Sequence, residues 1–107
     1  MVTINEAAQH IGIDYLDDEM TRANLQRALD SAIYRLYGAV GRDVETHMEG
    51  DPRIDTLVLI YTEEAYDNHP GSAKQDAAKN HLRDNLELML RLELRTLRES
   101  GGEANVR

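Results

Sequence analysis

The last third of the chain carries leucines at intervals of four and three residues, and this spacing constrains the fold more than any other feature. They are Leu82, Leu86, Leu90, Leu94 and Leu97. An α-helix turns once every 3.6 residues, so these side chains share one helix face, whereas a strand would scatter them over two faces. The spacing predicts a long helix that begins at a Ser72 cap and ends near Arg98. Leu88 and Leu92 lie well off this seam, so the helix has a second apolar side that needs a second partner.

Helical spacing also runs through the rest of the chain. Thr3 and Glu6 have the spacing of a capping box, and Asp51-Pro52 is a typical helix start. The segments 25–37 and 54–66 are apolar at helical intervals, whereas 41–51 has no clear period and reads as a loop with Val44 and Met48 as packing points. We therefore expect an all-α fold: a small four-helix domain over residues 1–99, with a long C-terminal helix and a long loop between its second and third helices. Residues 100–107 are expected to form a flexible polar tail.

The composition narrows the classes of function. The 107 residues include 20 acidic and 12 basic side chains, giving a net charge of −8, and there is no Cys, Phe or Trp. The acidic balance argues against tight binding to nucleic-acid phosphates, and the lack of cysteine excludes disulfides and thiolate metal sites. No apolar run approaches the roughly 20 residues of a membrane span, and the first residues lack the pattern of a signal peptide. The lean apolar content suits a subunit that partner subunits stabilise.

Candidate catalytic groups are sparse. The four histidines lie on separate segments, and His81 with Asp84 lacks a third metal ligand. Glu63, Glu64 and Asp67 have the spacing of Mg²⁺ ligands in helical nucleotide hydrolases, but the second carboxylate pair is missing, and a solvated acidic face is the favoured interpretation. Four tyrosines lie at helical spacing and are expected to be core residues with hydroxyl groups at the rim, in preference to a platform that stacks nucleotides: Tyr34, Tyr37, Tyr61 and Tyr66. We expect no enzyme, no catalytic residue, no cofactor and no metal.

The order of the segments resembles a known family. The opening Thr3-Ile-Asn-Glu-Ala-Ala-Gln-His-Ile-Gly-Ile-Asp14 is followed by an acidic turn, and Tyr37-Gly-Ala-Val-Gly-Arg42 ends the next amphipathic helix. An apolar helix then ends in Ala65-Tyr-Asp-Asn-His69, and a last helix follows. Over residues 1–98 this pattern is similar to the small head–tail connector proteins (head-completion or adaptor proteins) of long-tailed double-stranded DNA phages.

The resemblance implies a structural protein of the virion, or of a prophage. Such connectors form a homo-oligomeric ring, commonly of about twelve subunits, beneath the portal protein. They extend the DNA conduit, take part in head completion after DNA packaging, and present a surface to a neck, stopper or tail-completion protein. Double-stranded DNA passes through without tight or specific binding. The implied location is the neck of the virion, with the host cytoplasm as the site of assembly and no membrane contact.

Two sets of residues are candidates for these roles. An acidic wall repels DNA phosphates, so the acids of the 41–51 loop are the candidates for the conduit lining, and a merely solvated loop is the alternative. These acids are Asp43, Glu45, Glu49 and Asp51. The second side of the last helix is the candidate ring or portal contact, with packing inside the monomer as the alternative. The candidate residues are Leu88 and Leu92, together with Leu94 and Leu97 near the helix end. A different function also fits the sequence, a small cytosolic helical interaction or adaptor module that dimerises through the last helix. A helical Mg²⁺-dependent nucleotide hydrolase is the least favoured.

Overall fold

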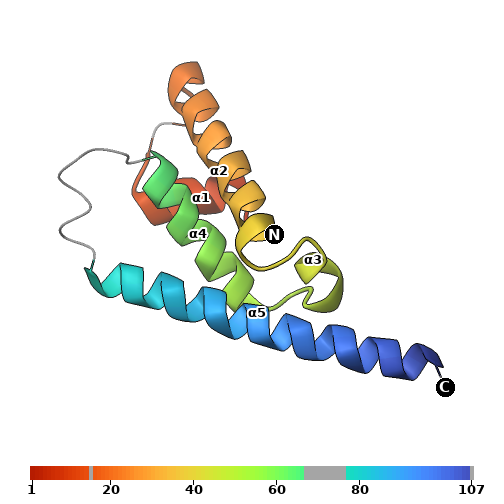
Figure 1. The fold of residues 1–107 in the computed structure, drawn as a ribbon. Coiled ribbons are helices and arrows are strands. Elements are labelled where there is room, and N and C mark those ends of the chain that lie inside the picture. Colours follow the sequence, from red (N-terminus) through yellow and green to blue (C-terminus); the bar gives the residue numbers. More distant parts are fainter. Residues whose placement is uncertain (15, 67–76, 107) are drawn as a thin grey trace.

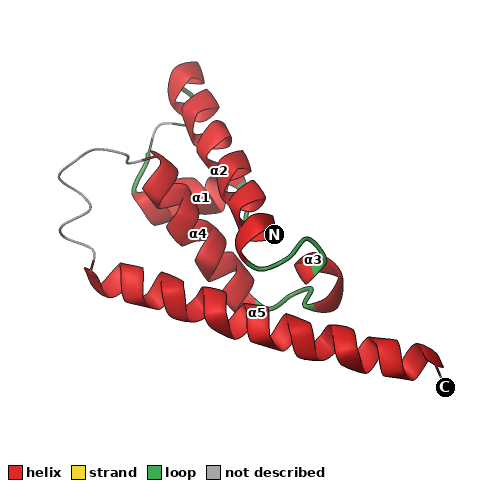
Figure 2. Cartoon of the chain, viewed as in Figure 1, coloured by secondary structure: helices red, strands yellow, loops and turns green. Residues whose placement is uncertain are grey.

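The fold is all-α, as the spacing predicts. A computed structural model describes residues 1–14, 16–66 and 77–106, and these ranges contain helices and connecting turns but no strand (Figure 2). The helices are α1 (Ile4–Ile11), α2 (Glu19–Ala39), α3 (Val44–His47), α4 (Pro52–Tyr66) and α5 (Ala77–Val106). The expected cap at Ser72 lies outside the described residues.

The helix boundaries follow from local chemistry. The amide of Glu6 donates to the Thr3 hydroxyl at 3.2 Å and the Thr3 amide donates to the Glu6 carboxylate at 3.0 Å, so the capping box opens α1 as predicted. Gly12 ends α1 in the left-handed conformation with φ of 91°. Asp18 caps α2 by accepting from the Thr21 amide at 3.0 Å. Pro52 is the first residue of α4, where its missing N–H costs no helical hydrogen bond.

Helix α4 lies at the centre of the bundle. It packs against α1, α2 and α5, and its contact with α2 is the most extensive between any two described helices (Figure 1). Leu57, Val58 and Tyr61 are almost completely buried. A helix that is apolar on most sides must be covered by several neighbours, which is why this segment occupies the centre.

Helix α5 is longer than the sequence indicated. It runs for 30 residues to Val106, about 45 Å at 1.5 Å per residue, in a molecule whose longest dimension is 54 Å. It crosses beside α4 and α3, and its C-terminal turns extend beyond the other helices (Figure 1). The expected end near Arg98 is therefore wrong, and residues 100–106 continue the helix where a flexible tail was expected. Adding a residue to an existing helix costs little free energy compared with starting one, so α5 can continue through this polar segment.

The segment 41–51 is not a simple loop. Residues Val44–His47 form the short helix α3, and the Met48 amide continues it by donating to the Val44 carbonyl at 2.9 Å. Val44 is fully buried and Met48 is 7% exposed, so both predicted packing points are confirmed. These two side chains anchor the acidic segment to the core and leave its carboxylates at the surface.

Candidate interaction surface

The outer side of α5 is apolar and exposed. Leu88, Met89 and Leu92 are 50%, 46% and 54% exposed, and Leu82 near the start of the helix is 46% exposed. The inner side of the same helix buries Leu86 and Leu90 in the core. The exposed set Leu88, Met89 and Leu92 occupies one turn of helix, and we call it the α5 ridge. Helix α5 therefore has two apolar sides, and the described part of the chain covers one of them.

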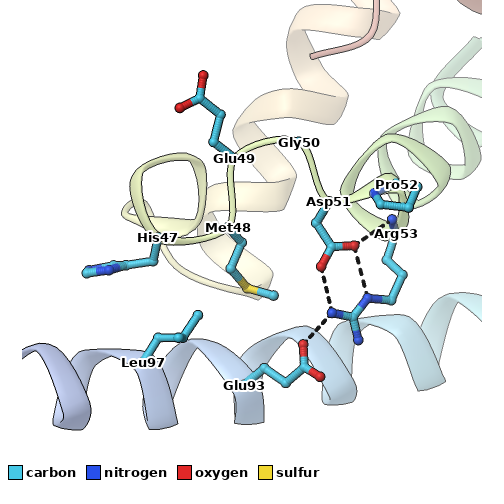
Figure 3. A pocket seen from close by; sticks show the side chains of 9 residues that line it. All are labelled: His47, Met48, Glu49, Gly50, Asp51, Pro52, Arg53, Glu93 and Leu97. Atoms are coloured by element: carbon cyan, nitrogen blue, oxygen red, sulfur yellow. Dashed lines mark hydrogen bonds and ion pairs between the residues drawn. The ribbon is translucent and has the colours of Figure 1, made fainter.

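The four predicted contact leucines separate into three environments. Leu88 and Leu92 lie on the ridge. Leu94 is fully buried, so its assignment to a contact surface is wrong: it continues the seam of Leu86 and Leu90 at four-residue steps and belongs to the core. Leu97 points toward the 47–53 segment, beside His47 and Met48 (Figure 3). Met89 belongs to the ridge but was not among the candidates, although its position beside Leu88 and Leu92 on the helix was available in the sequence.

The acidic segment is tied to α5 by arginines. Arg98 holds Asp43 through both carboxylate oxygens, with Nε to Oδ2 at 2.7 Å. Arg53 donates to Asp51 through Nε at 3.0 Å and Nη2 at 2.6 Å, and the same Nη2 contacts Glu93 of α5 (Figure 3). A third tie runs from Arg91 Nε to the Ala39 carbonyl at 2.9 Å. Helix α5 is thus clasped to the 39–53 segment by charged hydrogen bonds as well as by apolar packing.

These ties change the electrostatics of the predicted conduit acids. The Arg98 guanidinium lowers the pKa of Asp43 to about 2, mainly through its hydrogen bonds. Arg53 likewise lowers the pKa of Asp51. Glu45 accepts from the Tyr37 hydroxyl at 2.7 Å, which raises the pKa of that tyrosine. Since Asp43 and Asp51 are each matched by an arginine, the exposed Glu45 and Glu49 carry most of the remaining negative field of this segment.

Gly41 allows α5 to approach the segment closely. Its φ is +148°, which a residue with a side chain rarely adopts. A Cβ atom at this position would lie 2.5 Å from Arg98 Nη2 and 2.7 Å from Leu94 Cδ2. From the sequence, this glycine was interpreted as a helix terminator. In the fold its lack of a side chain makes room for Arg98 and Leu94 of α5.

The carboxylates of the hydrolase alternative have arginine and histidine neighbours. Glu64 lies between Arg35 at 3.2 Å and Arg83 at 2.5 Å. Glu63 contacts His10 Nε2 at 3.1 Å, and Asp67 lies outside the described residues. The two guanidinium groups already neutralise the negative charge with which Glu64 would bind a divalent cation. Among the described residues, no group of three or more His, Asp or Glu side chains is arranged to hold a metal ion.

The tyrosines occupy different environments. Tyr61 is 1% exposed, and its hydroxyl donates to Glu87 while Arg35 lies over its ring at 4.2 Å from the centroid. Burial, and then the bond to Glu87, raise the pKa of Tyr61. Tyr34 is 80% exposed on the outer side of α2, so its assignment to the core is wrong. Tyr34 is two positions from each of the buried Ala32 and Leu36, and a step of two residues turns a helix by about 200°, which places Tyr34 opposite the buried stripe.

Comparisons with protein-family models, curated proteins and solved structures found no match. Within the described ranges, none of the helices combines the length and the apolar character that crossing a bilayer requires. The function is therefore argued from the surface itself.

Proposed function

We propose that this chain is a structural subunit of a phage or prophage neck, and that it assembles into a ring beneath a portal protein to join head to tail. The observation that carries the proposal is the α5 ridge. Three apolar side chains on one turn, each about half exposed, remain on a helix whose other side is fully packed. A contiguous exposed patch of this kind is typical of a protein contact surface.

The size of the ridge suits a weak contact that other contacts in the same assembly reinforce. Fully burying one Leu or Met side chain contributes about 1.5–3 kcal/mol. Each ridge residue is about half exposed, so covering the exposed half in a contact would contribute about 1 kcal/mol to the free energy of association. The ridge and Leu82 together supply about 4 kcal/mol. Association costs about 4–15 kcal/mol in lost translational and rotational freedom. One ridge against a neighbour therefore falls at or below the low end of this cost, and a ring adds a second contact for each subunit and a portal a third.

The distribution of charge is consistent with side-by-side packing around a DNA conduit. Residues 14–19 hold four acidic side chains and no basic one, and residues 43–55 hold five acidic side chains and one arginine. These segments precede and follow α2, whose own length carries three arginines against two acids. From Asn80 to Glu99, α5 carries four basic and four acidic residues. Identical subunits can therefore meet through nearly neutral helices, while the acidic segments keep phosphates weakly bound.

The experiment is a mass measurement by light scattering after size exclusion, at several protein concentrations, with and without the cognate portal protein. A ring of roughly a dozen subunits, or a monomer that joins the portal, supports the proposal. A double variant, Leu88→Glu with Leu92→Glu, should lose this association. The matched control, Gln9→Glu on the exposed side of α1, should keep it.

One outcome would refute the connector function. If the chain is a dimer at every concentration and does not bind the portal, it is a helical adaptor that pairs through α5. The same double variant would then be monomeric. The two functions are thus separated by stoichiometry and by portal binding.

A further inference from the structure

The outer side of α2 has a hollow that matches the α5 ridge in character. The hollow lies beside Tyr34 and is mostly apolar, and its other lining residues are Arg35, Tyr37, Gly38, Ala39 and Arg42. Tyr34 stands at its edge and is 80% exposed. A Cβ atom at Gly38 would meet no atom within 4 Å, so the floor of the hollow is open at this residue. An exposed tyrosine beside an apolar hollow is the kind of site that receives a protruding apolar side chain.

The hollow and the ridge lie on different elements. Inside the subunit α5 reaches the edge of the hollow through Arg91, whose Nε donates to the Ala39 carbonyl at 2.9 Å, while Tyr34 and the ridge residues stay exposed. Helix α4 packs against both α2 and α5, far more extensively than α2 and α5 pack against each other. Arg35 marks the border of the hollow toward α4, where it contacts Glu64 at 3.2 Å, and α4 lies between α2 and α5 (Figure 1). The exposed Tyr34 and the ridge residues lie on the sides of α2 and α5 that α4 does not cover. Two complementary surfaces at different places on one chain make head-to-tail contacts, which close into a ring when the rotation permits.

Charges at the two ends of each surface fit one relative orientation. Asp30 lies on α2 one turn before Tyr34, and Arg42 borders the far end of the hollow. On α5, Asp84 lies one turn before the ridge and Arg95 lies just after it. All four side chains are exposed. The charges are separated by similar lengths of chain, so an antiparallel arrangement sets Asp84 against Arg42 and Arg95 against Asp30. The opposite orientation places like charges together.

We propose that the α2 hollow is the receptor for the α5 ridge of a second copy of this chain. This inference rests on the proposed ring and names the contact that builds it. In the antiparallel arrangement Leu92 of one subunit lies at Tyr34 of the next, and Leu88 lies at Gly38. Tyr34 adds roughly 150–250 Å² of contact area, which the ridge needs because it is small.

The absence of cysteine from the natural sequence makes a cross-linking test specific. The double variant Tyr34→Cys with Leu92→Cys is treated with a short thiol cross-linker at concentrations where the light-scattering mass is known. A head-to-tail contact predicts a ladder of dimers, trimers and larger species. Each single variant alone should stay uncross-linked, and a mixture of the two single variants should stop at dimers. The control pair Gln9→Cys with Leu92→Cys should give no ladder.

Several results would overturn the inference. If Leu92→Cys alone cross-links to dimers, α5 pairs with α5, and the adaptor function is favoured over the ring. If rings are observed but the double variant gives no ladder, another surface forms the subunit contact while the connector function still stands. If the chain is monomeric and unlinked at every concentration, copies of this chain do not meet through this surface, and portal binding alone then decides the connector function.

A charge exchange tests the orientation separately. Arg42→Asp should lower the fraction of oligomer severalfold, because it places an acid opposite Asp84. Adding Asp84→Arg should restore most of the oligomer. No restoration, with both variants folded by circular dichroism, would refute the antiparallel arrangement.

Discussion

Leu94→Ala compared with Leu92→Ala determines which side of α5 faces the core. The two residues are separated by a single position on the same helix, so the change in helix propensity is the same for both. Leu94 is fully buried, and its Cδ2 lies where Gly41 leaves space, whereas Leu92 is 54% exposed. The two substitutions therefore differ in burial and in little else.

The expected magnitudes follow from that difference. Truncating Leu94 removes buried methyl and methylene groups worth about 0.8 kcal/mol each and leaves a cavity, so the free energy of unfolding should fall by about 3 kcal/mol. For a chain of this length that is a lower melting temperature by about 12–24 °C. Truncating Leu92 removes groups that are only about half buried and creates no cavity, so the free energy of unfolding should fall by about 1 kcal/mol.

Urea unfolding followed by circular dichroism measures both variants. The protein is kept at a concentration where light scattering gives the monomer mass, because association would add stability through Leu92. The slope of free energy against urea should be unchanged, so that the shift in midpoint reports stability. Equal losses for the two variants, or a larger loss for Leu92→Ala, would show that our assignment of the inner and outer sides of α5 is wrong.

Three further predictions concern the contact of α5 with Gly41, the ion pair of Asp43 with Arg98, and the carboxylate of Glu64. Gly41→Ala should destabilise the chain by about 1–3 kcal/mol and speed amide exchange in the second half of α5, because the added Cβ displaces Arg98; unchanged exchange would contradict the close approach. The pKa of Asp43 is lowered to about 2 by Arg98, so its ion pair stabilises the fold above about pH 4 and this stability is lost as the pH falls toward 2. Arg98→Gln should therefore flatten the dependence of the urea midpoint on pH between 4 and 2, and an identical slope in both proteins would refute the assignment. Millimolar Mg²⁺ should leave the melting temperature unchanged, because Glu64 already contacts Arg35 and Arg83; a rise that Glu64→Gln abolishes would revive the hydrolase function.

Much of the helical architecture could be predicted because its signals are local. The capping box of Thr3 and Glu6, the proline that opens α4 and the spacing of apolar residues depend only on chain geometry and nearby side chains. The end of α5 was predicted wrongly, because the polar residues after Arg98 and the two glycines among them were interpreted as a stop, whereas the helix continues through them.

The candidate site was predicted only in part. Leu88 and Leu92 were identified correctly as lying on a second side of the helix, and the structure gives them similar exposures. Leu94 was misplaced because it was grouped with them for its position near the helix end, although its spacing matches the buried seam. Tyr34 was misplaced because four tyrosines at helical spacing look alike in sequence, and only packing separates the buried Tyr61 from the exposed one.

The sequence by itself determined that this chain is a set of helices, where most of them begin, and that its last helix has two apolar sides. These properties come from backbone periodicity and from contacts within one turn. The tertiary structure decided which side of α5 is buried, which acids are held by Arg53 and Arg98, and that Tyr34 borders a hollow on the outer side of α2. Such features depend on how helices distant in sequence are oriented about one another, since Asp43 and Arg98 are separated by 55 positions and meet only after α5 packs on the core.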